Sequence, residues 1–346
     1  MLEGFAAFDD KPDFLLFHSN RFTKQAKAIQ SGFDSWMQLK TTSVKMRWLE
    51  NLWRYSSLPK LEFFTGDFDV YHSFHHLMPP TKDKPRILTV HDLRRYQLPQ
   101  LYEHSKLDRF ELALRRADRI IAVSQSTKND LHSIFGLDED RIDVTHLAAD
   151  SGIKPLSDAQ RMEIKKRLSA KSGTKLDNFL MVFSSSDKRK NIARTIRAFT
   201  QAQKDLPDGI KLVIAGKPPK RDEITDVDNK SVVFTGPIDN IQEILGCSMA
   251  LVFASLYEGF GIPILEAFAS GVPVITSNCS SMPEVGADAA EYVDPYDIDS
   301  IARAILKVCN DPARREKMIT TGKQRNSDFT WAKTAAGTID SYEKTL

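Results

Sequence analysis

The sequence has few cysteines and no long apolar run, and both absences limit the settings in which the protein can work. Its three cysteines, Cys247, Cys279 and Cys309, are an odd number without CxxC spacing, which fits reduced thiols better than disulfides or a zinc site. No stretch reaches the roughly 18 apolar residues of a membrane span, and the amino terminus lacks the charged, apolar and small-residue order of a signal peptide. We therefore expect a cytoplasmic protein.

The chain also lacks an excess of charge of one sign. Lysine and arginine number 48, aspartate and glutamate 46, and the formal net charge is +2. No global field therefore favours nucleic acid, and recognition has to come from local sites. With 346 residues, of which 41% are hydrophobic, the chain is long enough for two domains with separate cores.

Short apolar runs alternate with polar segments of helical periodicity, which is typical of an α/β fold with buried parallel strands. The pattern restarts after a stretch around Gly152 and Pro155 that lacks apolar periodicity. We therefore expect two doubly wound domains, residues 1–152 and 153–330. A C-terminal helix over 331–346 should pack back on the first domain. The predicted strands are 13–17, 68–73, 86–92, 119–124, 143–147, 179–185, 211–216, 231–236, 249–255 and 273–277.

The segment EGFGIPILEAFASG, residues 258–271, directly follows a predicted strand. Its glycines let the backbone approach a ligand, Pro263 suits the first turn of a helix, and the N-terminal end of that helix favours a phosphate. Glu258 and Glu266 can accept hydrogen bonds from hydroxyls, so a nucleotide sugar would satisfy both features. The alternative is that each glutamate only favours a helix N-terminus. The candidate binding residues here are Glu258, Gly259, Phe260, Gly261, Ile262 and Glu266.

Two glutamates separated by seven residues, as in EGFGIPILE, resemble the signature of the retaining glycosyltransferases of family 4 (glycosyl transferases group 1) in the GT-B superfamily. The resemblance continues through residues 270–297. It implies two Rossmann-like domains facing across a cleft, with a nucleotide-diphosphate sugar on the second and a glycan or lipid-linked acceptor on the first. It also implies transfer with retention, without cofactor or catalytic metal. Glu266 would bind the ribose hydroxyls and Glu258 the transferred sugar.

Residues 183–199 resemble the family's segment in which a lysine clamps the donor diphosphate, and Lys190 matches that lysine. Ser185 stands where family members often carry an arginine, so Lys188 or Arg189 would have to supply a second cation. The alternative for Lys190 is a solvated charge in a KRK run. The residues added to the candidate donor site are Ser185, Lys190 and, in the loop resembling that beside the nucleobase, Gly236 and Ile238.

In the first domain, a predicted strand ends at His91, which resembles the family's histidine beside the transferred sugar. Together with Lys190 and Glu258 it is a candidate catalytic residue. The alternative is a histidine satisfied by neighbouring backbone at a strand end. Ser124 and Ser126 lie at the turn from another predicted strand to a helix, and Ser126 could be only a helix N-cap.

Two other patterns suggest a metal at first sight. His72, His75 and His76 follow a strand-like run, but no carboxylate pattern of a metal site accompanies them. Asp67 and Asp69 form the DxD triplet that metal-dependent glycosyltransferases use, yet the triplet lies at the start of a strand in the domain that is not expected to hold the donor. We therefore predict no metal site.

The segment Lys24–Lys60 holds three of the four tryptophans and seven basic residues against two acidic ones. A basic helix with Met46, Leu49, Leu52 and Trp53 on one face is compatible with peripheral contact to an anionic bilayer at the inner membrane face. The alternative, which we favour, is an ordinary domain helix with its apolar face in the core.

Members of the family usually begin with a strand and a glycine-rich loop, whereas here residues 2–8 should be helix and 14–17 the second strand. We therefore expect the first strand and its loop to be missing. The favoured function is transfer of a hexose, with mannose preferred, in surface polysaccharide synthesis. The alternatives are a catalytically impaired nucleotide-sugar-binding subunit and, less favoured, a nucleotide-sugar epimerase.

Overall fold

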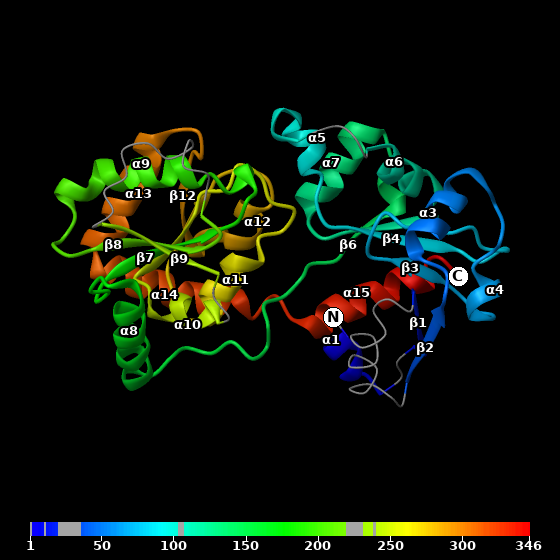
Figure 1. Ribbon diagram of the computed structural model, residues 1–346, viewed down its shortest axis with the longest axis horizontal. Helices are drawn as coiled ribbons and strands as arrows, with labels where there is room; N and C mark the ends of the chain where they lie inside the picture. Colours follow the sequence, from blue (N-terminus) through cyan, green and yellow to red (C-terminus); the bar gives the residue numbers. More distant parts are fainter. Residues whose placement is uncertain (1, 10–11, 20–35, 103–106, 219–230, 238–239) are drawn as a thin grey trace. The chain divides into compact units, whose positions relative to one another are not determined.

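Two compact units make up the chain (Figure 1). Unit 1 comprises Met1–Leu93, His104–His146 and Thr330–Leu346, and unit 2 comprises Arg94–Glu103 and Leu147–Phe329. No helix in the described ranges is long and apolar enough to cross a bilayer. The computed structural model describes residues 2–9, 12–19, 36–102, 107–218, 231–237 and 240–346.

Unit 1 contains two parallel sheets. Strands β1 and β2 pair with each other, with Phe14 opposite Met37. The second sheet has the order β3-β4-β5-β6, with all neighbours parallel. Its strands and helices are β1 (Phe14–Ser19), β2 (Met37–Thr42), β3 (Tyr71–Ser73), β4 (Arg86–Val90), β5 (Arg119–Ala122), β6 (Ile142–Val144), α1 (Leu2–Ala6), α3 (Met46–Tyr55), α4 (Glu62–Thr65), α6 (Leu107–Arg116), α7 (Gln125–Phe135) and α15 (Trp331–Glu343).

The core of unit 1 forms where apolar strands meet the C-terminal helix. Ile87 of β4 and Ile121 of β5 are at most 2% exposed, and they pack with Tyr342 of α15. The Tyr342 hydroxyl also lies 2.8 Å from Nδ1 of His72. Helix α15 contacts α1, β5 and β6, and Figure 1 shows it beside α1. The last helix is thus part of the core of unit 1.

Unit 2 is built on one six-stranded parallel sheet with the order β12-β11-β10-β7-β8-β9. Counted within the unit, this order is 6-5-4-1-2-3, which is that of dinucleotide-binding folds. The order reverses between β7 and β10, and ligands of such sheets bind outside the carboxyl ends of the strands at this reversal. The strands are β7 (Phe179–Ser184), β8 (Lys211–Gly216), β9 (Val232–Gly236), β10 (Ala250–Phe253), β11 (Val274–Ser277) and β12 (Ala290–Val293).

Helices cover both faces of this sheet, as the prediction of a doubly wound fold requires. Helices α9 and α13 pack on each other over one face, and α10, α11 and α14 lie on the other (Figure 1). The helices of unit 2 are α5 (Arg94–Gln97), α8 (Asp158–Ser172), α9 (Ile192–Ala202), α10 (Ile241–Cys247), α11 (Ile262–Ala269), α12 (Met282–Gly286), α13 (Ile298–Asn310) and α14 (Pro312–Asn326).

Candidate functional site

The loop after β7 carries the lysine expected to bind phosphate. Asp187 accepts a hydrogen bond from a backbone N–H two residues later at 3.1 Å, which starts the short 3-10 turn η4 (Lys188–Lys190). Asn191 follows in the left-handed conformation, with φ 58°, which asparagine tolerates better than most residues. Its amide donates to the carbonyls of Ala254 at 3.0 Å and Pro295 at 2.7 Å. The loop is therefore fixed to the segments that follow β10 and β12.

The loop after β10 brings the first glutamate to the same edge of the sheet. Residues 254–261 are all buried. The hydroxyl of Ser281 lies within hydrogen-bond distance of the carbonyl oxygens of Glu258 (2.9 Å) and Phe260 (2.8 Å). Gly261 has φ 104° immediately before α11, a conformation that any side chain would strain. The segment thus forms the glycine turn and helix that its sequence predicts.

The two loops meet in a buried cluster of four charges. Nζ of Lys190 lies 2.7 Å from Oε1 of Glu258, and the guanidinium of Arg189 pairs with the other carboxylate oxygen. Arg189 also donates to the carbonyl of Tyr257 and, through Nε, to Asp187, each at 3.0 Å. The side chains of Glu258, Arg189 and Lys190 are only 9, 11 and 14% exposed. Their charges therefore interact more strongly than they would in water.

Burial and ion pairing shift the pKa values of Glu258 and Lys190 in opposite directions. Burial alone would raise the pKa of Glu258, but the charges of Lys190 and Arg189 outweigh it and the pKa is lowered. Burial lowers the pKa of Lys190, and Glu258 only partly restores it. The ammonium of Lys190 also lies 4.6 Å from the centre of the Phe253 ring, a contact that favours the charged form of the lysine. Because its pKa is lowered, Glu258 is ionised at neutral pH.

Glu266, the second glutamate, lies half-buried in α11. Burial raises the pKa of its carboxyl group, and the charge of Asp150 raises it further. Its backbone carbonyl accepts hydrogen bonds from Ser270. Among the residues that the structure describes, none donates a hydrogen bond to the Glu266 carboxylate. This carboxylate can therefore accept hydrogen bonds from a ligand.

The other predicted donor contacts that the structure describes belong to the same unit. Ser185 directly follows β7, and its hydroxyl accepts a hydrogen bond from the backbone N–H of Asp187 at 3.2 Å, so it supports the turn. Gly236 ends β9 with φ 66°. Gly259 is buried and Ile262 half-buried at the start of α11. The remaining candidate, Ile238, lies outside the described residues.

His91 belongs to unit 1, where it directly follows β4 at the carboxyl end of the sheet. The residue is exposed, yet the surrounding protein partly desolvates the ring and lowers its pKa, while the charge of Asp92 opposes this shift. The site in unit 2 and this histidine are thus held on separate units. The catalytic assignment of His91 remains a prediction.

The structure shows which serine caps α7 and what His72 contacts. The N-cap of α7 is Ser124, whose hydroxyl accepts from the backbone N–H of Thr127 at 3.0 Å, so the alternative that Ser126 is the helix N-cap is wrong. His72 uses both ring nitrogens, on Tyr342 at 2.8 Å and on Thr89 at 2.7 Å, and burial lowers its pKa to about 3. Within the described ranges, no group of three acidic, histidine or cysteine side chains could hold a metal.

Sequence reasoning missed residues that hold the cluster in place. The Tyr102 hydroxyl donates to Asp187 at 2.6 Å, and Arg94 lies 3.5 Å from the same carboxylate. Both belong to the segment Arg94–Glu103, which is part of unit 2. Arg189, considered only as a substitute cation, is instead the link between Asp187 and Glu258. The only signal was its position beside Lys190.

Models of two protein families match the chain. That of the glycosyl transferases group 1 matches residues 164–325, and that of glycosyltransferase family 4 matches residues 36–151. O-antigen chain mannosyltransferase B of Escherichia coli is 26% identical over 286 residues, which cover 79% of this chain and 74% of that protein. The serotype-specific mannosyltransferase WbdA of Escherichia coli is 27% identical over 285 residues, 78% of this chain. The match spans only 33% of WbdA.

Solved structures share the architecture at low sequence identity. HepE of Anabaena, in complex with UDP and glucose, has a TM-score of 0.67 at 15% identity, covering 97% of this chain and all of that one. WaaG, a glycosyltransferase involved in lipopolysaccharide biosynthesis, has a TM-score of 0.66 at 15% identity, covering 96% and 99%. Both domain models, the relatives and the strand order agree with the motif resemblance. The chain therefore belongs to the family 4, group 1 glycosyltransferases and has the GT-B fold.

Proposed function

We propose that this glycosyltransferase moves a hexose, with mannose preferred, from a nucleotide-diphosphate sugar to a glycan or lipid-linked acceptor in surface polysaccharide synthesis. Transfer proceeds with retention of configuration and without a metal. The names of the Escherichia coli relatives support the sugar and the pathway, and the complex of HepE with UDP supports the class of donor. The observation that carries the proposal is the cluster of Lys190, Arg189 and Glu258 at the strand reversal.

The donor diphosphate lies between Lys190 and the N-terminal end of α11. Backbone N–H groups at a helix start and a lysine charge together offset the charge of the phosphates without a metal ion. The half-buried carboxylate of Glu266 accepts hydrogen bonds from the ribose hydroxyls. Gly259 and Gly261 carry no side chains, so the backbone at the start of α11 can approach the ligand closely. Residues 153–330 are the proposed donor domain.

The pairing of Lys190 with Glu258 gives both residues a role in the reaction. When the glycosidic bond breaks, the leaving diphosphate gains negative charge, and a fixed ammonium stabilises that charge in the transition state. Arg189 stays paired with Glu258, so the carboxylate remains ionised when Lys190 turns to the donor. Glu258 then accepts hydrogen bonds from the transferred sugar. His91, in unit 1, contributes from the acceptor side.

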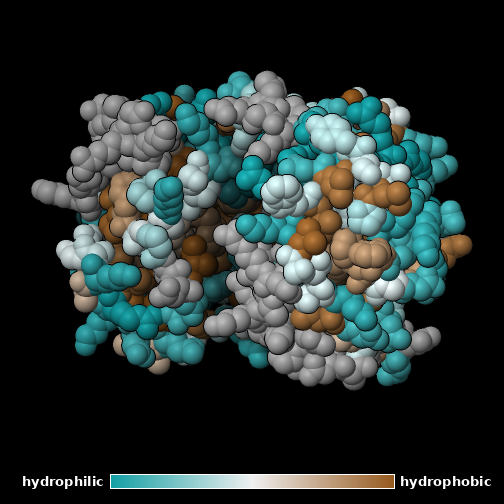
Figure 2. Space-filling model, turned by 45° about the vertical axis from the view of Figure 1, so that its right-hand side comes forward, coloured by the Kyte–Doolittle hydropathy of each residue, from teal (hydrophilic) through white to brown (hydrophobic). Residues whose placement is uncertain are grey.

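Helix α3 is the proposed contact with the inner face of the cytoplasmic membrane. It buries Leu49 and Trp53, as the core alternative predicts, but Trp48, Leu52 and Tyr55 are 71, 45 and 83% exposed. Figure 2 shows hydrophobic side chains reaching the surface among hydrophilic ones. Apolar side chains beside basic residues are the composition that binds an anionic bilayer surface.

The experiment that tests the proposed function starts from a thermal-shift panel of nucleoside diphosphates and their sugars. The best binder is then incubated with the protein and acceptor glycans in the presence of a chelator, and the anomeric configuration of the product is determined by NMR. We expect stabilisation by one nucleotide class and a product with the donor's configuration. Inversion would contradict the retaining mechanism, and loss of turnover with the chelator would contradict metal independence. Binding without turnover on any acceptor would favour a nucleotide-sugar-binding subunit.

A further inference from the structure

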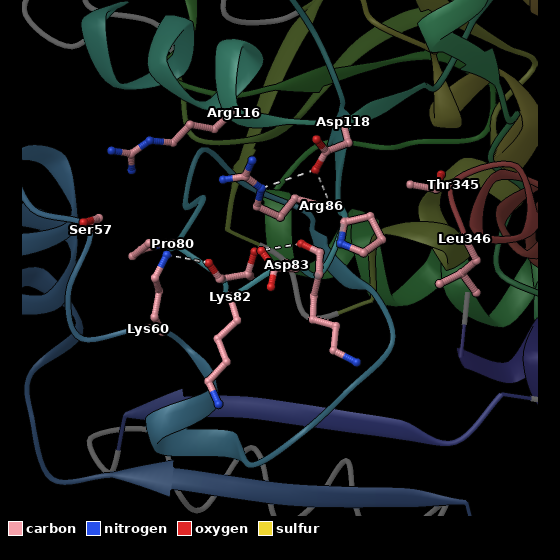
Figure 3. Close-up of a pocket in the computed structure, with 13 residues that line it drawn as sticks. Ser57, Lys60, Pro80, Lys82, Asp83, Arg86, Arg116, Asp118, Thr345 and Leu346 are labelled. Atoms are coloured by element: carbon pink, nitrogen blue, oxygen red, sulfur yellow. Dashed lines mark hydrogen bonds and ion pairs between the residues drawn. The ribbon is translucent and has the colours of Figure 1, made fainter.

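Unit 1 contains a pocket of about 690 Å³ at the amino-terminal edge of its second sheet (Figure 3). Strand β4 begins there at Arg86 and ends at Val90, so His91 lies at the opposite edge. The pocket is therefore separate from the carboxyl edge that carries His91. Its lining residues are Ser57, Lys60, Pro80, Thr81, Lys82, Asp83, Lys84, Pro85, Arg86, Arg116, Asp118, Thr345 and Leu346.

The side chains that line this pocket carry more positive than negative charge. Five are lysine or arginine and two are aspartate. Arg86 pairs with Asp118 at 3.3 Å, whereas Lys60 and Arg116 donate only to backbone carbonyls. In the described part of the chain, no carboxylate lies within ion-pair distance of these two side chains. The positive charges of Lys60 and Arg116 are therefore not neutralised by a carboxylate of the described residues.

Lys60 and Arg116 also have more N–H groups than their contacts use. An ammonium carries three donors and a guanidinium five. Lys60 donates once, to Thr81 at 2.8 Å, and Arg116 uses Nη1 alone, on Trp53 at 2.7 Å and Met78 at 3.2 Å. Desolvation and the like charge of Arg86 both lower the pKa of Arg116. Half-buried cations of this kind are stabilised by an anion that accepts the remaining donors.

Figure 3 shows which cations can act together. Lys60, Arg86 and Arg116 line one side of the pocket, while the side chain of Lys82 extends away from Arg116. A phosphate group suits this arrangement because its oxygens accept several hydrogen bonds at once and its charge pairs with both guanidinium and ammonium. A free phosphate is much smaller than the pocket, which leaves room for the rest of a ligand.

We propose that this pocket binds a phosphate-bearing ligand through Lys60, Arg86 and Arg116. Tyr55 and Leu58, on either side of the lining residue Ser57, are 83 and 62% exposed. Apolar side chains beside the phosphate site favour a phospholipid headgroup over a soluble phosphate compound. The inference does not depend on the donor chemistry of unit 2.

The test measures binding of pyrophosphate by calorimetry and of vesicles by sedimentation. The vesicles are phosphatidylcholine with and without phosphatidylglycerol. The variants are Lys60→Gln and Arg116→Gln, and the matched control is Arg115→Gln, because Arg115 is the exposed neighbour of Arg116 and does not line the pocket. Lys190→Ala alters the donor site of unit 2 and leaves the pocket unchanged, so binding that persists in this variant but falls in the pocket variants belongs to the pocket. Thermal melting checks that each variant folds.

We expect binding of at least one probe to persist in Lys190→Ala and to fall about 10- to 100-fold in Lys60→Gln and Arg116→Gln, as for loss of a charge-assisted hydrogen bond. Arg115→Gln should bind like the wild type. A loss of phosphatidylglycerol-vesicle binding in Lys60→Gln and Arg116→Gln identifies a lipid headgroup, and a loss of pyrophosphate binding alone identifies a soluble ligand. The proposal would be overturned if Lys60→Gln, Arg116→Gln and the control Arg115→Gln all lost binding equally. It would also be overturned if the wild type bound neither probe. Should Arg116→Gln not fold, Lys60→Gln decides alone.

Discussion

At the scale of single residues, the carboxylate of Glu258 joins two cations in a buried site. Removing it leaves Lys190 and Arg189 buried without their common partner, whereas removing Lys190 leaves Glu258 paired with Arg189. Breaking a buried pair by removing one partner costs about 3 to 5 kcal/mol. Glu258→Gln should therefore destabilise the protein by about that amount and Lys190→Ala by clearly less. Urea unfolding of both variants measures the difference, and equal losses would contradict the proposed pairing.

Glu266 gives a prediction about nucleotide affinity. Its carboxylate has no protein donor among the described residues, so the proposed ribose contacts supply its hydrogen bonds. Loss of a charge-assisted hydrogen bond costs about 1.5 to 3 kcal/mol, or roughly 10- to 150-fold in affinity. Glu266→Gln should weaken binding of the free nucleotide by this factor. Glu258→Gln should leave it nearly unchanged, because its partner is the sugar. Titration calorimetry with the nucleoside diphosphate measures the affinity of both variants, and equal affinities would contradict the separate roles of the two glutamates.

The same carboxylate should make binding depend on pH. A ligand that binds the ionised form loses affinity as the pH falls through the pKa, and burial together with Asp150 raises the pKa of Glu266. The loss should therefore begin at a higher pH than it would for an exposed glutamate. Nucleotide titrations at decreasing pH test this expectation. A profile that is unchanged in Glu266→Gln would assign the pH dependence to another group.

The sequence predicted the residues that have a motif but not the contacts between them. Glu258, Glu266 and Lys190 were found because their spacing matches a known pattern. Nothing in that pattern shows that Lys190 and Glu258 pair in the free protein, since the pair joins loops 68 residues apart. Asp187 and Asn191 were passed over because their roles, a cap and a left-handed turn, depend on local backbone geometry.

At the scale of elements, the segment Arg94–Glu103 fixes the loop after β7. Leu98 packs in an apolar cluster with Leu256 and Tyr257, and Tyr102 donates to Asp187. We predict that Tyr102→Phe lowers the melting temperature and raises KM for the donor a few-fold with little change in kcat, because Asp187 keeps its pairing with Arg189. The matched control is Tyr296→Phe, an exposed tyrosine of the same unit. An unchanged KM would mean that the Tyr102 hydrogen bond does not position the donor loop.

Strands with apolar runs could be predicted from the sequence, and two strands without them could not. Each of the ten predicted runs overlaps a strand, and most of these runs are apolar because both faces of a parallel sheet are covered. Strand β2 was missed because exposed and half-buried residues interrupt it. Strand β12 was missed because it has four residues, three of them only half-buried. Its place in the sheet comes from pairing with β11.

At the scale of the whole molecule, membrane contact and donor binding are assigned to different units and can be separated by mutation. Replacing Trp48 and Leu52 by serine should reduce sedimentation with anionic vesicles severalfold, because each removes exposed apolar surface that would insert into the interface. Nucleotide binding should stay as in the wild type. Met162→Ser in unit 2 is the matched control, since Met162 is 71% exposed. Unchanged sedimentation of the double variant would remove α3 from the membrane contact.

The measurement that tests the central claim most directly is steady-state kinetics of Lys190→Ala with the donor found in the nucleotide panel. Lys188→Ala is the control, because Lys188 lies exposed in the same turn. If Lys190 stabilises the leaving diphosphate, kcat should fall by about 100- to 1000-fold, the effect of losing roughly 2.7 to 4 kcal/mol of transition-state stabilisation. Donor affinity should change much less, and Lys188→Ala should retain most of its activity. A fall in kcat below about threefold for Lys190→Ala, in a protein that melts like the wild type, would contradict the assignment of the donor site.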